Sequence, residues 1–308
     1  MPDYHTFKKY LPPMKKLESY FNDIHHHFPE LNIFSIQKIG EGDNSVAFEI
    51  NGIYIFRFPK REEVKYQLEK EIKMLPKIRQ HLSFAIPEFK FIPPTLSFAG
   101  HVKITGIPLS NKRYYSLGKK YQVSVQHSLA EFLKQLHHIP LPELQNCGLD
   151  IINLKEEYSD NFFNAKQSIY PNISENKRNI ISHLFNAYLN EPANFNYEPA
   201  LIHNDLSKDH ILSDPSTGHL SGIIDFGDAA IGDPDYDFMY LFDEFGNNFL
   251  HGILNNNQHQ NIMSKLLFFT LGNRVQILLK AVEDDNAADI KNGYDKLHAW
   301  FKKYDNKE

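Results

Sequence analysis

The sequence has few of the features that mark secreted, membrane or nucleic-acid-binding proteins. It contains one cysteine in 308 residues, so it cannot form an internal disulfide. Its first residues lack the apolar core of a signal peptide, and no apolar run approaches the length that crosses a bilayer. The formal net charge of −5 is opposite to the basic excess of a general nucleic-acid binder. We therefore expect a cytoplasmic globular monomer that binds neither nucleic acid nor membranes.

A hydrophobic content of 42% is enough to bury a large core, in one large domain or in two lobes. The first third of the chain shows short apolar and alternating runs typical of strands. The expected strands are 34–39, 45–50, 53–58, 89–92 and 101–104. The remainder is mostly helical in pattern, with an Asn-rich loop at 255–258. We expect an α+β fold with a β-rich lobe over residues 1–104 and a larger helical lobe over 105–308.

Two carboxylates, Asp205 and Asp225, lie in short loops on either side of an expected hairpin, with His210 between them. This arrangement suits phosphoryl transfer, in which one carboxylate deprotonates an attacking hydroxyl and the other holds Mg²⁺ against nucleotide phosphates. Protein kinases place H-x-D, a metal ligand five positions after that Asp, and D-F-G in this order. The matching residues here are His203, Asp205, His210 and Asp225-Phe226-Gly227. Two turn aspartates that merely cap backbone would leave this spacing unexplained.

The two histidines of this pattern have different interpretations. His210 stands where protein kinases place an Asn that binds the second metal ion. Mg²⁺ prefers oxygen ligands, so the alternative is a structural histidine bonded to the catalytic loop. We interpret Asp225 and His210 as metal ligands and Asp205 as the catalytic base. We interpret His203 as a structural residue that fixes the loop through hydrogen bonds to the backbone.

The first expected hairpin occupies the place of the loop with which a kinase covers nucleotide phosphates. Gly40 and Gly42 alone also fit an ordinary tight turn, but the strand that follows carries Arg57, where kinases have a Lys that pairs with phosphates and a helix glutamate. We assign Glu71 as that glutamate, because Glu69 would point to a different face of the helix. The expected nucleotide-binding residues are Gly40, Gly42, Ser45, Arg57, Glu71, and Lys103 and Ile104 of the hinge.

Residues 225–244 contain seven acidic residues and neither Lys nor Arg. Such a cluster beside a catalytic centre would attract a polycation and repel acidic metabolites. Asp233 and Asp237 have a structural interpretation, because they are placed to cap a helix. We interpret three of the remaining acids as contacts for substrate amines: Asp228, Asp243 and Glu244.

The chain resembles the aminoglycoside phosphotransferases, specifically their 2″-hydroxyl branch, over about residues 30–245. The motifs that carry the resemblance are His203-Asn-Asp-Leu-Ser-x-Asp-His-Ile-Leu212 and Ile223-Ile-Asp-Phe-Gly-Asp-Ala-Ala-Ile-x-Asp-Pro-Asp-x-Asp-Phe238. The resemblance implies a bilobal protein-kinase-like fold and transfer of the γ-phosphate of ATP or GTP to an aminoglycoside hydroxyl, with two Mg²⁺ ions. A His at the position of His210 also occurs in that branch.

Some features depart from this family and keep alternatives open. The branch usually carries Lys where this chain has Arg57, and the C-terminal part matches poorly. The fold could instead serve a macrolide, choline, homoserine or sugar kinase, or a non-catalytic nucleotide-binding pseudokinase. A metallohydrolase built on His203, Asp205 and His210 would leave Asp225-Phe-Gly without a role. Asn204 replaces the Arg of kinases that need activation-loop phosphorylation, which predicts activity without such a switch.

Overall fold

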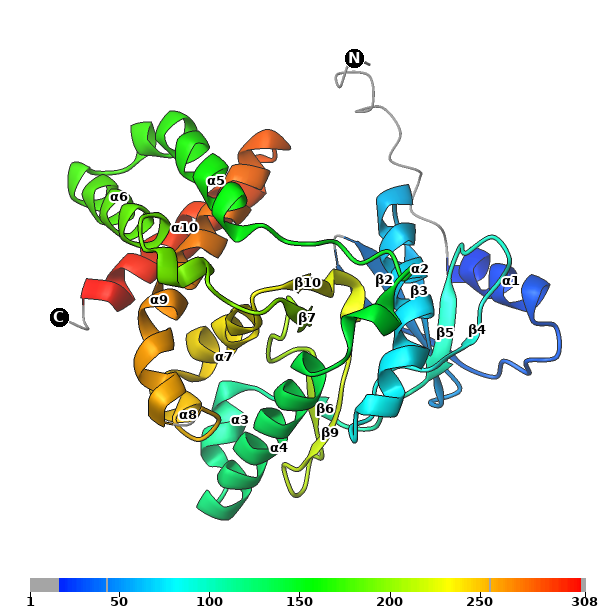
Figure 1. Cartoon of the computed structure of the whole chain (residues 1–308). Coiled ribbons are helices and arrows are strands. Elements are labelled where there is room, and N and C mark those ends of the chain that lie inside the picture. The colour runs from blue at the N-terminus through cyan, green and yellow to red at the C-terminus, as the bar shows by residue number, and fades with distance from the viewer. Residues whose placement is uncertain (1–16, 43, 255, 306–308) are drawn as a thin grey trace. The chain divides into compact units, whose positions relative to one another are not determined.

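A computed structural model of the chain describes residues 17–42, 44–254 and 256–305 (Figure 1). The chain divides into two compact units, which are described separately. The first contains the residues up to Glu69 together with Pro87–Lys103. The second contains Lys70–Ile86 and the chain from Ile104 onward. The first unit is rich in strands and the second is mainly helical, so the expected α+β class is confirmed.

The first unit is an antiparallel five-stranded sheet in the order β1-β2-β3-β5-β4, with helix α1 (Leu17–His27) packed on it. The strands are β1 (Ile36–Glu41), β2 (Ser45–Ile50), β3 (Tyr54–Pro59), β4 (Phe89–Phe91) and β5 (Ala99–Val102). Asn51 (φ 56°) and Gly52 (φ 71°) form the turn between β2 and β3, as their residue types predict. Phe56 and Phe58 are buried on one face, so Arg57 lies on the other.

The second unit contains two small antiparallel sheets, β10-β7 and β6-β8-β9, with eight α-helices and the C-terminal half of α2 (Glu62–Ile78) among its described residues. The strands are β6 (Ile107–Pro108), β7 (Ala200–Ile202), β8 (Ile211–Ser213), β9 (Leu220–Ile223) and β10 (Ala230–Gly232). The helices are α3 (Asn111–Ser116), α4 (Lys119–His137), α5 (Leu154–Ser168), α6 (Glu175–Leu189), α7 (Phe238–Phe245), α8 (Asn247–Leu250), α9 (Asn256–Glu283) and α10 (Ala287–Asp305). Because α9 begins at Asn256, helix replaces the expected loop at 255–258; Asn255 lies outside the described residues.

The β7–β10 and β8–β9 ladders fix both acidic loops at both ends. The loop with Asp205 runs from β7 to β8, and the loop with Asp225 runs from β9 to β10. Strand β7 pairs with β10, and β8 pairs with β9. The starts and ends of the two loops are therefore held side by side by backbone hydrogen bonds. The sequence predicted the β8–β9 hairpin but not the β7–β10 ladder.

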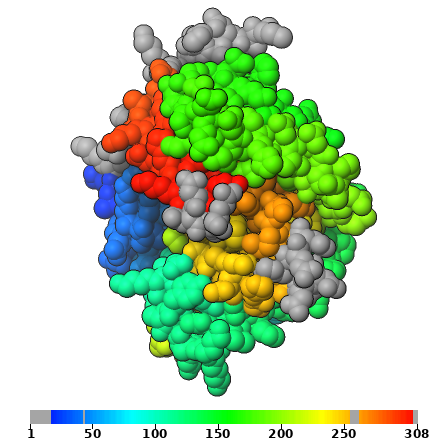
Figure 2. Space-filling view, turned by 90° about the vertical axis from the view of Figure 1, so that its left-hand side faces the viewer, coloured from blue at the N-terminus to red at the C-terminus, as the bar shows by residue number. Residues whose placement is uncertain are grey.

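Helix α9 is the central helix of the second unit and packs against α5, α6, α7 and α10. Figure 2 shows three of the helices that pack against α9: α5 and α6 in green and α10 in red. Within the described residues, the segment Ile262–Glu283 is long and apolar enough by length and composition to cross a membrane, contrary to the sequence expectation. Of its apolar window 61% is buried inside the protein, as in the core helix of a globular unit.

Gly222 lies at a close approach between two backbone segments. A Cβ atom there would be 2.6 Å from the carbonyl oxygen of Ala85 and 2.8 Å from Ile104 Cγ2. The Ala85 carbonyl also accepts the N–H of Ile223 (3.0 Å), so it cannot move away freely. Only glycine fits this point of β9, the strand that leads to Asp225.

We expect Gly222→Ala to lower the free energy of unfolding by about 2 kcal/mol, because the added methyl group overpacks a backbone contact. Gly118→Ala is the control, since its new Cβ atom would have its nearest neighbour at 3.9 Å. Urea unfolding of both variants measures the difference. Equal stability of the two variants would contradict the close approach at Gly222.

Candidate active site

Asp237, at the start of α7, holds the beginning of the catalytic loop. Its buried carboxylate accepts three hydrogen bonds: from the N–H of His203 (3.0 Å), the N–H of Asn204 (2.8 Å) and Nε2–H of His137 (2.9 Å). These bonds compensate for the burial of the charge. Asp237 therefore has a structural role, but the predicted helix cap is wrong: its side chain makes no cap bond and holds the loop instead. Asp233 does cap the short helix that precedes α7, through the N–H of Asp235.

His203 joins the two acidic loops. Its fully buried ring donates from Nε2 to the carbonyl of Ile224 (3.1 Å), and its Nδ1 accepts the N–H of Asp205 (3.4 Å). Burial lowers the pKa of His203 to about 4, so the ring is neutral at pH 7. The structure gives His203 the structural role that the sequence predicted.

His210 lies between the two predicted catalytic carboxylates. Its Nδ1–H donates to the carbonyl of Asp205 (2.8 Å), which leaves a lone pair on Nε2 in the neutral ring. Nε2 faces Asp225 Oδ2 at 3.5 Å. A carboxylate oxygen at this distance favours a positive charge at Nε2, either a proton on the ring or a bound cation. Donating Nδ1–H to a carbonyl is also the usual arrangement of a metal-binding histidine.

The His210–Asp225 pair therefore fits a cation. Neighbouring ligands of octahedral Mg²⁺ lie about 3 Å apart, close to the spacing seen here. Over residues 17–42, 44–254 and 256–305, no cluster of three or more His, Cys, Asp or Glu is placed to hold a metal ion. An ion at this pair would complete its shell with water and phosphate oxygens, as Mg²⁺ usually does.

Asp205 has the properties of a general base. Burial, partly offset by His210, and the negative charges of Asp228, Asp225 and Glu244 raise its pKa to about 6. The carboxyl is then mostly ionised at pH 7, yet more basic than an ordinary aspartate. Its side chain keeps 29% of its surface exposed, so an acceptor can reach it.

Helix α2 clamps the segment that carries Asp225. Glu71, fully buried, accepts the N–H of Phe226 (3.1 Å). The neighbouring Lys70 is also buried and donates from Nζ to the carbonyl of Ala229 (2.8 Å). Burial lowers the pKa of Lys70. Consecutive residues of one helix thus hold both ends of the turn after Asp225, which itself has a left-handed backbone (φ 65°). The sequence predicted Glu71 for phosphate positioning and missed Lys70.

The structure shows ion pairs for two of the predicted substrate acids, whose contact with a substrate stays a prediction. Glu244 accepts both the N–H (2.6 Å) and Nζ (2.8 Å) of Lys208, and so holds the far end of the catalytic loop. Asp243 pairs with Arg274 (2.5 Å) and Lys303 (3.3 Å). Their charges are balanced by cations of this chain. Asp228 is exposed, and its carbonyl accepts Nδ2–H of Asn204 (3.0 Å).

The predicted nucleotide residues of the first unit lie on its sheet. Gly40 is at the bulged end of β1, Ser45 begins β2, and the N–H of Gly42 donates to the Ser45 carbonyl (3.1 Å). Arg57 is half-buried on β3. The N–H of Lys103, another predicted nucleotide-binding residue, donates to the Ile53 carbonyl (2.7 Å). Ile104, in the second unit, packs beside Gly222.

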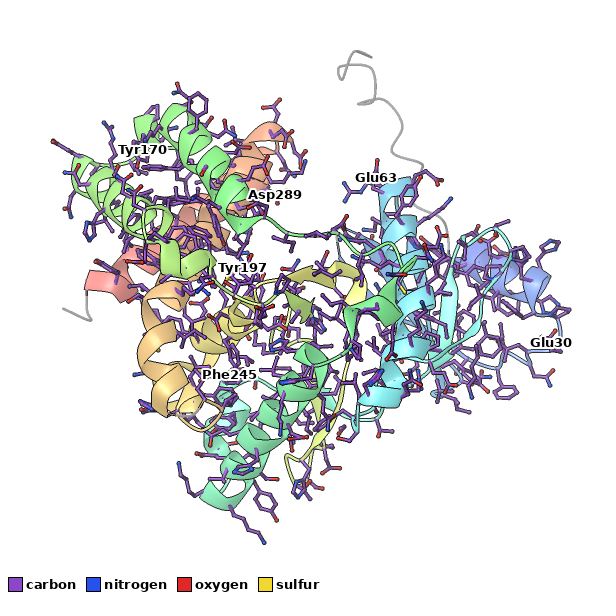
Figure 3. All side chains as sticks on the ribbon, viewed as in Figure 1. Glu30, Glu63, Tyr170, Tyr197, Phe245 and Asp289 are labelled. Carbon is purple, nitrogen blue, oxygen red and sulfur yellow. The ribbon has the colours of Figure 1, made fainter. Side chains whose placement is uncertain are left out.

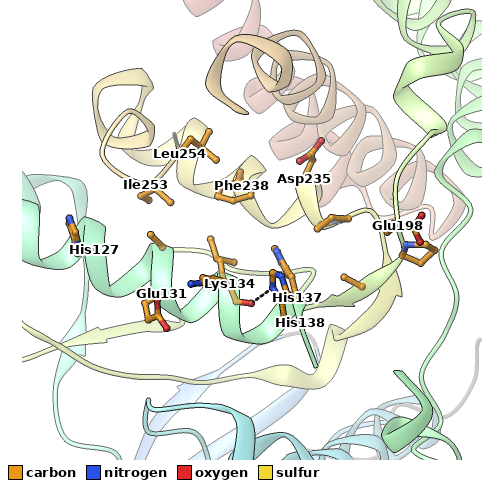
Figure 4. A pocket seen from close by; sticks show the side chains of 15 residues that line it. His127, Glu131, Lys134, His137, His138, Glu198, Asp235, Phe238, Ile253 and Leu254 are labelled. Carbon is orange, nitrogen blue, oxygen red and sulfur yellow. Dashed lines mark hydrogen bonds between the residues drawn. The ribbon is translucent and has the colours of Figure 1, made fainter. Parts of the chain in front are cut away.

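A cavity of about 920 Å³ lies between α4 and α7 (Figure 4). His137, which bonds to Asp237, is among its lining residues, together with Asp235 and Phe238. None of the predicted catalytic, metal or substrate residues lines it. This cavity is therefore separate from the predicted catalytic, metal and substrate residues.

We expect His203→Gln to change the pH dependence of stability. The folded pKa of His203, about 4, is below the value of about 6.5 for an unfolded histidine. The unfolded chain therefore takes up a proton between these pH values that the folded chain does not. The stability of the wild type relative to the variant should fall by up to about 3 kcal/mol from pH 6.5 to 4. The measurement is the free energy of unfolding of both proteins across this pH range. A difference between them that does not change with pH would contradict a buried neutral His203.

Comparisons with known structures identify proteins of similar fold. The structure matches the GDP complex of wild-type aminoglycoside 2'-phosphotransferase-IIIa with a TM-score of 0.89 and 29% identity, over 93% of this chain and 98% of the other. It matches the GDP and kanamycin complex of APH(2")-IIia with a TM-score of 0.87 and 30% identity, over 92% and 99%. The fold is therefore kinase-like, as the motifs implied.

The sequence comparisons point the same way. The chain is 26% identical over 201 residues to the uncharacterized protein YcbJ of Bacillus subtilis (strain 168). This match covers 63% of this chain and 63% of the length of that relative. Residues 35–266 match the family model described as the phosphotransferase enzyme family. The chain belongs to the phosphotransferase enzyme family.

Proposed function

We propose that this chain transfers the γ-phosphoryl group of ATP or GTP to a hydroxyl of an aminoglycoside, with two Mg²⁺ ions. The observation that carries the proposal is the placement of Asp205, His210 and Asp225 on two loops that share both of their flanking ladders. The similarity to enzymes solved with GDP, and in one case kanamycin, supports the donor and acceptor classes.

In the proposed reaction Asp205 accepts a hydrogen bond from the acceptor hydroxyl and takes its proton as the bond to phosphorus forms. Its raised pKa suits this role near neutral pH. His210 and Asp225 would hold a magnesium ion, whose charge offsets that of the phosphate oxygens. His203 and Asp237 keep the loop in place, so Asp205 needs no rearrangement when the acceptor binds.

A cationic acceptor fits the charges around Asp205. Asp228 is exposed near Asp205 and contributes to its raised pKa, so both carboxylates favour a positively charged neighbour. A phosphorylated or acidic acceptor would be repelled. An aminoglycoside combines the required hydroxyl with several ammonium groups.

The test is nucleotide release by the purified chain with Mg²⁺ and ATP or GTP. Kanamycin, gentamicin, choline and a macrolide are offered separately as acceptors. The proposal predicts stimulation by at least one aminoglycoside above the rate without acceptor. Stimulation by choline or the macrolide alone, or by no acceptor, would contradict it.

We expect Asp205→Asn to lower kcat by about 10³-fold, because the amide can neither accept the hydroxyl proton nor orient the oxygen equally well. Asp209→Asn is the matched control, since Asp209 is an exposed carboxylate of the same loop. Steady-state kinetics with the best acceptor compares the two variants. Retention of activity by Asp205→Asn would remove Asp205 from this role.

We expect His210→Ala to raise the Mg²⁺ concentration needed for half-maximal activity by about 10-fold or more, because a ligand atom is lost. His219→Ala, at an exposed histidine of the β8–β9 turn, should leave the Mg²⁺ requirement unchanged. Titration of activity with Mg²⁺ measures both. If His210→Ala needs no more Mg²⁺ than the wild type, His210 is not a metal ligand and only bonds to the loop.

A further inference from the structure

One face of α7 follows the catalytic loop along its length. Asp237, Tyr240 and Glu244 are three and four residues apart, so they share this face. Asp237 binds the start of the loop at His203 and Asn204, and Glu244 binds its far end at Lys208. Tyr240 lies between these two anchors, so its ring faces the middle of the loop, where Asp205 is.

The hydroxyl of Tyr240 is oriented by α9. Asn273, almost fully buried, donates from Nδ2 to the Tyr240 oxygen (3.0 Å). Because the oxygen accepts this bond, the hydroxyl hydrogen remains able to donate to another oxygen. Burial and the nearby charge of Asp205 raise the pKa of Tyr240 to about 12, so the hydroxyl is protonated at neutral pH.

The next turn of α9 orients a carboxylate. Gln276 donates from Nε2 to Oε1 of Glu157 (2.5 Å), which lies on α5. Asn273 and Gln276 are three residues apart on α9, about 4.5 Å along its axis. Tyr240 of α7 and Glu157 of α5 are therefore oriented by residues on neighbouring turns of α9.

Glu157 is suited to bind a cation from outside the chain. It is half-buried, and burial raises its pKa although Gln276 stabilises the charged form. In the part of the chain that the structure describes, no Lys or Arg forms an ion pair with it. The nearby cations of α9 are engaged elsewhere, Arg274 with Asp243 and Lys280 with Asp284. A partly desolvated carboxylate with only a neutral partner favours an ammonium group.

We propose that Tyr240 and Glu157, oriented by Asn273 and Gln276, form the acceptor-binding wall of the second unit. Tyr240 donates to an oxygen of the ring that carries the reacting hydroxyl, and Glu157 binds an ammonium group on a more distant ring. This inference rests on the proposed function and narrows the expected acceptors to molecules with several amino groups. Two binding groups on different helices suit a polyamine of several rings better than choline, which has a single ammonium group.

The first test compares Glu157→Gln with Glu156→Gln. Glu156 is the exposed neighbour on the same helix, so the two variants lose the same charge. Glu157→Gln should raise the KM for kanamycin about 10-fold or more, with kcat and the nucleotide KM unchanged. Glu156→Gln should match the wild type. Thermal unfolding of each variant shows whether it is folded.

The second test is Tyr240→Phe, which removes the hydroxyl and keeps the ring. It should raise the KM for kanamycin several-fold while the KM for the nucleotide stays at the wild-type value. Unchanged acceptor KM values in folded Glu157→Gln and Tyr240→Phe, with wild-type turnover of kanamycin, would overturn this inference alone. A wild type that phosphorylates no aminoglycoside would overturn the proposed function, and this inference with it.

Discussion

The buried carboxylate of Asp237 is the contact on which the active site depends. Its two oxygens accept hydrogen bonds from the backbone of His203 and Asn204 and from the ring of His137. Helix α7 then holds the other end of the same loop through Glu244 and Lys208. Aromatic contacts anchor the C-terminal end of α7, since Phe245 (labelled in Figure 3) packs against Tyr114 and Phe249. A loop fixed at both ends presents Asp205 in one position.

The charges of the second unit fall into two groups. Buried or half-buried acids that shape the loops have cations or amide donors as partners, as Glu244 has Lys208 and Asp243 has Arg274. The groups assigned to the reaction, Asp205 and Asp225, face each other across His210. Holding these two carboxylates so close costs free energy that a metal ion and a cationic acceptor would recover.

Local patterns in the sequence predicted much of this arrangement. Strand alternation, the Asn51-Gly52 turn and the order of Asp205, His210 and Asp225 depend on neighbouring residues, and the structure places them as expected. Contacts between distant residues could not be predicted. Arg274 is 31 positions from Asp243, and Gln276 is 119 positions from Glu157, so no local pattern identifies these partners. Strands β7 and β10, of three residues each, are too short to show a period.

Mass spectrometry of kanamycin after incubation with the chain, Mg²⁺ and GTP or ATP tests the central claim most directly. If Asp205, His210 and Asp225 act as described, kanamycin gains one phosphoryl group with the wild type and none with Asp205→Asn. Unmodified kanamycin in the presence of folded wild-type protein and both nucleotides would contradict the account. Modification that continues undiminished in Asp205→Asn would contradict it equally.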